Sequence, residues 1–186
     1  MRVETRERLI EAAAEELWSR GYAATSPNRI QRRASAGQGS MYHHFRGKAD
    51  LARAAIGRSS EALRARTDEA LAGLQGLEAV IAYLRIQRDP LRGCPVGRLA
   101  ADADIVADPS LRDPVAAALH GIRERVRSLL TDEPACAGPD VLAATVAAVV
   151  QGGYVLARAA GDRAPYDAAI EGAVALLGAS TNKESR

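Results

Sequence analysis

The sequence predicts an all-α protein of about nine helices, with an N-terminal head of three helices followed by a helical body. Three observations support this fold class. Of the 186 residues, 39 are alanine and only 4% are aromatic, so helix formers outnumber strand formers. Apolar residues recur at intervals of three and four, which is the spacing of one helix face. Glycine and proline divide the chain into segments of helical length.

The first predicted helix has one apolar stripe and ends at Gly21. The stripe consists of Ile10, Ala13, Ala14, Leu17 and Trp18. A second helix is expected over residues 27–34, because Ser26 is a good N-cap and Pro27 suits the first helical position. Ser35, Ala36 and Gly37 can turn the chain, and a third helix is expected over residues 38–44.

The remaining helices are marked by caps and breaks. Asp-Pro pairs at 108–109 and 113–114 both have the form of a helix start, and the apolar stripe of the long seventh helix follows the second pair. The expected ranges are 48–71, 77–88, 96–106, 115–130, 139–158 and 165–179. These divide the chain into a head at residues 1–47, a body at 48–180 and a polar, flexible tail at 181–186.

Charge is distributed unevenly although the net charge is only +2. Residues 1–56 hold ten basic and six acidic residues, and no acidic residue occurs between Glu16 and Asp50. A basic segment of this kind is usually a solvated surface. It also fits a polyanionic partner such as DNA.

Three helices with a tight turn between the second and third form the helix-turn-helix pattern, in which the third helix enters the major groove. Small or hydrogen-bonding side chains at its start suit contact with base edges, and hydroxyl or basic groups around it suit phosphates. The candidate DNA-binding residues are Ser26, Asn28, Arg29, Arg33, Gln38, Gly39, Ser40, Tyr42, His43 and Lys48. Arg32 also belongs to the basic set that could hold the flanking DNA backbone.

A family resemblance covers about a quarter of the chain. Gly21-Tyr22 with Thr25-Ser26, and Tyr42-His43-His44-Phe45 with Lys48, resemble the N-terminal domain of the TetR family of transcriptional repressors. The resemblance implies an all-α homodimer with a DNA-binding head and an effector-binding body. The turn departs from the family pattern at Ser35 and Ala36, and Gln31 follows Ile30 where the family usually has Ala. Ser35 is expected to occupy a strained turn conformation.

A second resemblance lies in the body. The run Gly93-Cys94-Pro95 is similar to a segment of the LmrA/YxaF-like branch, whose members respond to small lipophilic compounds. An apolar cavity with a few polar groups would suit such a ligand. The candidate ligand-binding residues are Tyr83, Leu84, Gln87, Cys94, Leu99, Ile122, Val126, Gln151 and Tyr154, most of which could equally be core.

The last two helices, 139–158 and 165–179, are the expected homodimer interface, because small side chains allow close packing. Gly152-Gly153 fits a close helix approach at a dimer interface or a pocket. The resulting hypothesis is a homodimeric repressor that binds a near-palindromic double-stranded DNA operator and is released by a small lipophilic effector. The alternative is a regulator whose body only dimerises or binds a protein partner, and activation instead of repression is also open.

Several other classes are not expected. The charged N-terminus has no apolar signal region, and the apolar segment 141–160 is interrupted by polar residues, which favours a buried helix over a membrane span. Two cysteines favour a reduced cytoplasmic protein, with Cys94 structural and not a redox sensor. No cofactor is expected. No metal site is expected either, because the adjacent His43 and His44 point apart on a helix. The sequence carries no enzyme motif.

Overall fold

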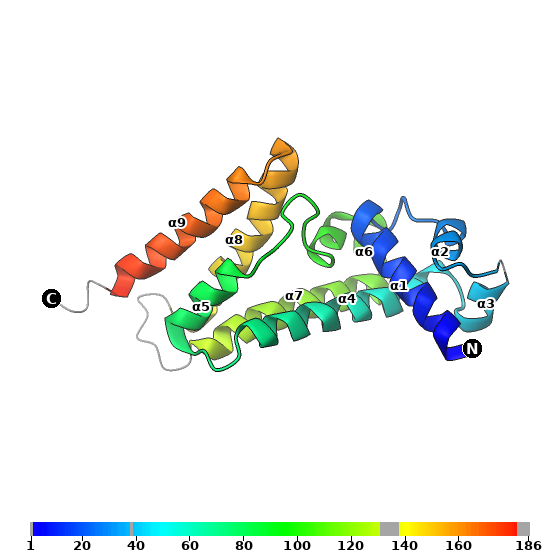
Figure 1. Ribbon diagram of the computed structural model, residues 1–186, viewed down its shortest axis with the longest axis horizontal. Helices are drawn as coiled ribbons and strands as arrows, with labels where there is room; N and C mark the ends of the chain where they lie inside the picture. The colour runs from blue at the N-terminus through cyan, green and yellow to red at the C-terminus, as the bar shows by residue number, and fades with distance from the viewer. Residues whose placement is uncertain (1, 38, 131–137, 182–186) are drawn as a thin grey trace. The chain divides into compact units, whose positions relative to one another are not determined.

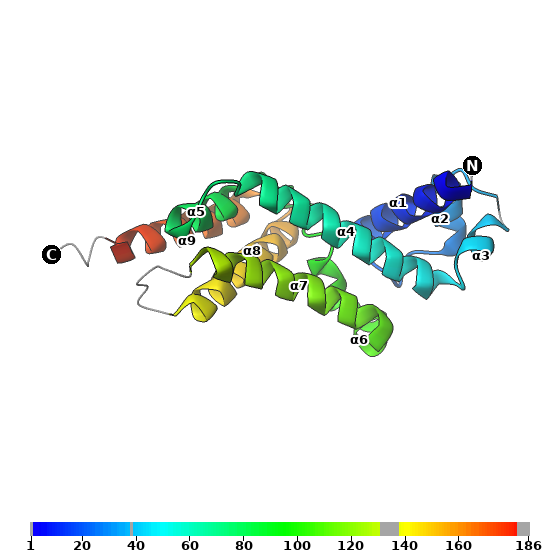
Figure 2. The ribbon, with the colours of Figure 1, turned by 90° about the horizontal axis from the view of Figure 1, so that it is seen from below.

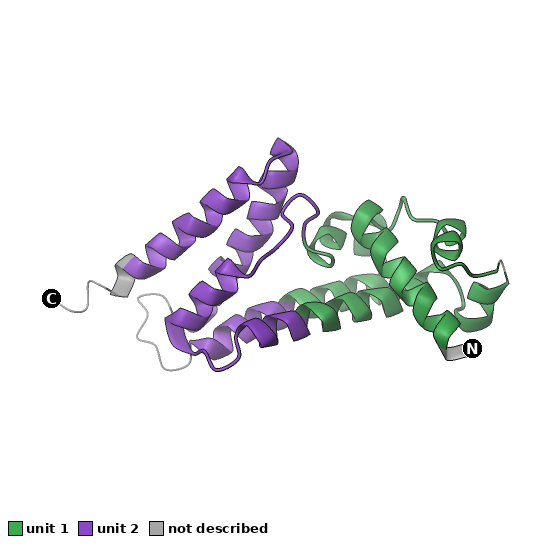
Figure 3. Cartoon of the chain, in the orientation of Figure 1, with its two compact units in different colours: residues 1–63, 94–119 green, residues 64–93, 120–186 purple. Residues whose placement is uncertain are grey.

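The computed structural model describes residues 2–37, 39–130 and 138–181, without the side chains of residues 2, 3 and 179–181. Within this part of the chain there are nine α-helices, one 3₁₀ helix and no strand, which confirms the predicted fold class (Figure 1). The described residues fall into two compact units, shown in Figure 3: residues 1–63 with 94–119, and residues 64–93 with 120–186. The helices α4 and α7 contribute residues to both units.

The first unit begins with α1 (Arg2–Arg20), α2 (Pro27–Arg33) and α3 (Ser40–His44). Helix α1 contacts both α2 and α3, and Ile10, Ala13 and Leu17 of its apolar stripe are buried. The predicted signals at the junction are confirmed. Gly21 ends α1 with a φ of 82°, and the Ser26 side chain accepts a hydrogen bond from the Arg29 N–H while Pro27 opens α2. The core of these helices consists of Leu9, Ala13, Leu17, Ile30, Ala34, Met41 and Phe45.

Helix α4 (Lys48–Ala70) follows directly after α3 and packs Leu51, Ala55 and Ile56 into the first unit. Its start depends on Asp50, whose carboxylate accepts a hydrogen bond of 3.2 Å from the Arg46 N–H. This contact compensates for Gly47, which has no side chain with which to cap a helix.

The predicted helix over residues 96–106 is wrong in one respect, because the segment is split. A 3₁₀ helix η1 (Gly97–Ala101) is followed by α6 (Ala103–Ala107). The break occurs at Asp102, which has an extended backbone and whose side chain accepts a hydrogen bond from the Asp104 N–H. Asp102 therefore acts as the N-cap of a new helix and not as a residue inside one long helix.

Helix α7 (Pro109–Leu129) begins at the first Asp-Pro pair, so the predicted start after Pro114 is wrong. Asp108 accepts a hydrogen bond of 2.9 Å from the Ser110 N–H, which fixes the helix start there. Pro114 lies inside the helix, near its beginning. There its missing N–H removes a single backbone hydrogen bond without ending the helix.

The second unit contains α5 (Gly76–Arg85), α8 (Pro139–Ala160) and α9 (Ala164–Thr181). Helix α9 contacts both α8 and α5, and α8 and α9 lie side by side in Figures 1 and 2. Helix α5 ends three residues before the predicted Arg88, because the Arg88 guanidinium folds back and donates to three carbonyl oxygens at the end of α5. The buried apolar residues of these helices include Ala79, Val80, Leu84, Val146, Val150, Ala157 and Ile170.

Gly153 allows α8 and α9 to approach closely. A Cβ atom on Gly153 would lie only 2.8 Å from Cδ2 of Tyr166 on α9, whereas nothing lies within 4 Å of a Cβ on Gly152. A close helix approach at Gly153 is therefore confirmed, between two helices of the same chain, and its predicted place at a dimer interface or a pocket stays a prediction. The predicted loop residues 131–137, including Cys136, and tail residues 182–186 lie outside the described residues.

Candidate nucleic-acid interface

The turn between α2 and α3 holds the third helix in place at the cost of one strained residue. Ser35 has a φ of 49°, in the left-handed region that favours glycine, as expected from the sequence. The Ser35 N–H donates to the Arg32 carbonyl at 3.2 Å, and the Ala36 N–H donates to the Gln31 carbonyl at 2.9 Å. These bonds close the end of α2 and direct the chain toward α3.

Helix α3 has a buried side and an exposed side, as a recognition helix requires. Met41 is fully buried and Phe45 is nearly so, which anchors the helix to the head. Tyr42 is 62% exposed, and His43 and Gly39 are exposed as well. Ser40 is partly exposed. These residues stay DNA-contact predictions, while Gln38 lies outside the described residues.

Lys48 has a partner within the head. Its Nζ lies 3.9 Å from the centre of the Tyr22 ring, which is a cation–π contact. Burial lowers the pKa of the Lys48 ammonium, while the carboxylates of Asp104 and Asp102 act in the opposite direction. A phosphate contact by Lys48 therefore competes with its place over Tyr22.

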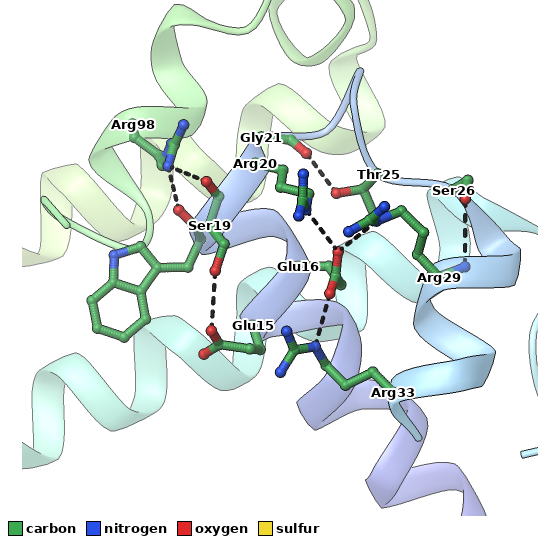
Figure 4. Close-up of polar contacts among 11 residues, drawn as sticks. Glu15, Glu16, Ser19, Arg20, Gly21, Thr25, Ser26, Arg29, Arg33 and Arg98 are labelled. Carbon is green, nitrogen blue, oxygen red and sulfur yellow. Dashed lines mark hydrogen bonds and ion pairs between the residues drawn. The ribbon is translucent and has the colours of Figure 1, made fainter. Parts of the chain in front are cut away.

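Glu16 is the centre of a buried ion cluster in the head that the sequence reasoning missed. Its carboxylate is buried and lies 2.8 Å from the Arg33 Nε, 3.2 Å from the Arg29 Nε and 3.5 Å from the Arg20 Nε (Figure 4). Burial raises the pKa of Glu16, but the hydrogen bonds from Arg33 and Arg29 outweigh it and hold the pKa below its usual value. The sequence feature that could have indicated this cluster is an acidic residue beside the apolar stripe of α1, followed by a long segment that contains arginines and no other acidic residue.

A second cluster attaches the segment 97–104 to the end of α1. Arg98 donates to the carbonyl oxygens of Trp18 and, at 3.0 Å, Ser19 (Figure 4). Asp102 Oδ2 accepts hydrogen bonds from the N–H groups of Tyr22 at 2.8 Å and Ala23 at 3.0 Å. A basic group thus meets the last carbonyls of α1, and an acidic group meets the free N–H groups just after it. Sequence spacing gave no signal for a contact across some eighty positions.

The candidate ligand-binding residues are divided between the two units. Cys94 and Leu99 belong to the first unit and the other seven to the second. Cys94 is buried, and its Sγ accepts a hydrogen bond of 3.2 Å from the Gly97 N–H, which supports a structural role. In the second unit Tyr83, Leu84, Val126 and Tyr154 are buried, Ile122 and Gln151 are partly exposed, and Gln87 is exposed.

Tyr166 joins the predicted Tyr154 in a buried pair. The two ring centres lie 5.1 Å apart, and the buried Tyr166 hydroxyl lies near the Arg88 guanidinium and the Tyr154 side chain without a well-formed hydrogen bond to either. Burial raises the pKa of Tyr166, and the nearby Arg88 guanidinium acts against that shift. A polar group of a ligand could complete the hydrogen bonding of this hydroxyl.

No group of three or more His, Cys, Asp or Glu that could hold a metal ion occurs in the described ranges. The head instead has the geometry of a DNA-binding helix-turn-helix: a capped α2, a tight turn, and an α3 anchored on one side and exposed on the other. An all-helical body follows it. Fold and site thus define a helix-turn-helix transcriptional regulator.

The comparisons identify the family. A model described as "Bacterial regulatory proteins, tetR family" matches residues 9–55, and one described as "Tetracyclin repressor-like, C-terminal domain" matches residues 71–173. The chain belongs to the TetR family of DNA-binding transcriptional regulators.

Similar proteins are regulators and not enzymes. The uncharacterized HTH-type transcriptional regulator Rv0196 of Mycobacterium tuberculosis is 30% identical over 87% of this chain and 88% of its own. The transcriptional regulator AcuR of Cereibacter sphaeroides is 32% identical over 73% of this chain and 68% of its own. The crystal structure of a TetR transcriptional regulator from Chloroflexus aurantiacus has a TM-score of 0.81 at 29% identity, covering 95% of this chain and 96% of that chain.

Proposed function

We propose that this regulator is a cytoplasmic homodimeric repressor that binds a near-palindromic operator and is released by a small lipophilic effector. In this proposal residues 1–47 bind DNA, and residues 48–180 bind the effector and form the dimer. The observation that carries the proposal is an exposed apolar surface on the last two helices. Its large members are Val141, Val155 and Leu156 on α8 and Leu176 on α9, which are 55–73% exposed in the single chain.

Exposed apolar area of this kind is unusual on a soluble monomer and favours a partner surface. Among the described helices α8 alone is long and apolar enough to cross a membrane, by length and composition only, and most of its apolar part is not buried in the single chain. A second copy of the chain would cover the same apolar side chains. A dimer would also place two heads on one duplex, which matches a palindromic site.

Substitutions on this surface test the dimer. Val155→Glu with Leu156→Glu is expected to convert a dimer into a monomer in sedimentation equilibrium, because two charges would be buried at the contact. Val106→Glu, at a 48% exposed position on α6, is the matched control and should leave the mass unchanged. A native protein that sediments as a monomer at micromolar concentration would refute the dimer.

The effector site rests on the buried aromatic pair of the second unit. Tyr154 and Tyr166 offer apolar ring surface, and the Tyr166 hydroxyl offers a polar group whose hydrogen bonding is incomplete. An apolar site with a few polar groups suits a small lipophilic compound. The effector would act only through a different affinity for the DNA-competent and DNA-incompetent conformations.

Membership of the LmrA/YxaF-like branch is part of the same proposal. It is supported by the Gly93-Cys94-Pro95 run and by similarity to two Bacillus subtilis regulators. LmrA is 30% identical over 57% of this chain and 61% of its own, and YxaF is 31% identical over 58% and 61%.

The test of repression and release is fluorescence anisotropy on the DNA upstream of the protein's own gene, with scrambled DNA as the control. We expect sequence-dependent binding with a steep salt dependence, followed by release on addition of a compound found in a thermal-shift screen. If every compound that stabilises the protein leaves the affinity for DNA unchanged at saturation, the body is a dimerisation or protein-binding module instead.

A further inference from the structure

Helix α2 carries three arginines that lie on two different faces. Residues four apart share a helix face, so Arg29 and Arg33 lie together. Arg32 is rotated by about 100° from Arg33 and by about 60° from Arg29, toward the side of Asn28. The basic segment is therefore not one uniform surface, and its arginines can have different roles.

The face with Arg29 and Arg33 is turned toward α1. Both Nε atoms donate to the buried carboxylate of Glu16, at 3.2 Å and 2.8 Å (Figure 4). Glu16 is only 4% exposed, so losing either donor would leave a buried charge with fewer partners. These two arginines hold α2 against α1.

The other face of α2 is open. Asn28, Gln31, Arg32 and Ala36 line a hollow of about 380 Å³ that leads from α2 into the turn before α3. Asn28 and Arg32 are exposed, and Arg32 forms no ion pair within the described residues. A guanidinium without a counter-charge beside an exposed amide is a donor set that suits a phosphate.

We propose that Arg32, with Asn28 beside it, makes the phosphate contact of α2, while Arg29 and Arg33 hold the helix in position through Glu16. The occupant is DNA and not an acidic protein segment, because the hollow borders the turn that presents the recognition helix α3. In a helix-turn-helix the helix before the turn crosses the DNA backbone. The inference rests on DNA binding by the head and adds which side chain supplies the charge.

The experiment compares Arg32→Ala with Arg33→Ala in the full-length protein. The probes are a duplex selected from a random-sequence pool by the native protein and a shuffled duplex of the same composition. Each phosphate contact contributes about 0.9 to the slope of log affinity against log salt. We expect Arg32→Ala to make this slope shallower by about 0.9 for each bound head, and therefore by about 1.8 for a dimer bound through both heads, on both duplexes. The Tm should stay unchanged, because the side chain is exposed.

Arg33→Ala is the matched control, one position away and with the same change in charge. We expect it to lower the Tm by roughly 3–10 °C, because Glu16 loses its shortest hydrogen bond, and to leave the salt slope unchanged. Arg32→Lys should restore the slope, and Arg32→Gln should behave as Arg32→Ala.

Two results would overturn the inference. One is a shallower slope for Arg33→Ala with a native slope for Arg32→Ala. The other is a loss for Arg32→Ala on the selected duplex alone with the slope unchanged, which would make Arg32 a base-reading residue. A native protein that selects no duplex and binds neither probe would instead refute the operator-binding proposal, so the two failures are distinct.

Discussion

Gly153 offers a test of packing in which the opposing terms can be separated. Gly153→Ala adds one methyl group inside α8, and its Cβ would lie 2.8 Å from Cδ2 and 3.4 Å from Cε2 of Tyr166. Real Cβ atoms do not approach this closely, so the Tyr166 ring must move. The ring is 5% exposed and stacks near Tyr154, so it has little freedom to do so.

The magnitude follows from two contributions. Replacing glycine by alanine inside a helix stabilises the folded state by about 1 kcal/mol. Forcing an extra methyl group into a packed contact costs about 1–3 kcal/mol. Gly152→Ala should give the first contribution alone within the chain, because no atom of the same chain lies within 4 Å of its Cβ. The free energy of unfolding of the Gly153 variant should therefore lie about 1–3 kcal/mol below that of the Gly152 variant.

Urea unfolding followed by far-ultraviolet circular dichroism, at one fixed protein concentration, measures this difference. Gly121→Ala in α7 is a second open control, on a helix away from the proposed dimer surface. Sedimentation of each variant shows whether assembly has changed. Equal stabilisation by all three substitutions would refute the reasoning, since it would mean that the contact between α8 and the Tyr166 ring is loose.

Four further predictions concern single side chains. Ser35→Gly should raise the free energy of unfolding by roughly 1 kcal/mol in urea unfolding, because it removes the cost of a positive φ. Folding lowers the pKa of Glu16, so the ionised carboxylate stabilises the protein above the usual carboxyl pKa of 4.5, and this stabilisation is lost as the pH falls through the folded-state pKa. Glu16→Gln should therefore reduce the fall in Tm at acid pH. Asp102→Ala should lower the free energy of unfolding by about 2 kcal/mol, because two backbone N–H groups lose their acceptor, whereas Asp104→Ala should change it by less than about 0.5 kcal/mol. Tyr166→Phe should leave the free energy of unfolding within about 1 kcal/mol of native or raise it, because the hydroxyl forms no well-formed hydrogen bond, and it should weaken binding of any effector that uses this hydroxyl. A large loss of stability would show that Arg88 or Tyr154 already satisfies the hydroxyl.

The sequence predicted those features of the fold that depend only on a residue and its neighbours in the chain. The stop at Gly21, the Ser26–Pro27 start of α2 and the strained Ser35 each depend on one residue and its neighbours, and all three are confirmed. Pro114 was misjudged because the proline signal is the same at a helix start and in its first turns, and only the hydrogen bond of Asp108 decides between them.

Long-range polar contacts could not be predicted in the same way. Glu16 reads as an ordinary charged helix residue until the fold places α2 beside it. Arg98 and Asp102 find their partners near the end of α1 only in the folded chain. Composition suggested a DNA-facing role for all the arginines of α2 alike. The side-chain contacts instead separate Arg29 and Arg33, which hold the helix through Glu16, from Arg32, which forms no ion pair within the described residues.

The attachment of Arg98 and Asp102 to the end of α1 has a consequence for protein engineering. A chimeric regulator could be designed by joining the DNA-binding segment of one relative to the body of another at the start of α4. Such a junction would separate α1 from both side chains, so the graft would keep the recognition helix and lose the groups that complete its supporting helix. A working exchange in this protein must transfer residues 98 and 102 together with the head, or choose a recipient that has an arginine and an aspartate at the same places.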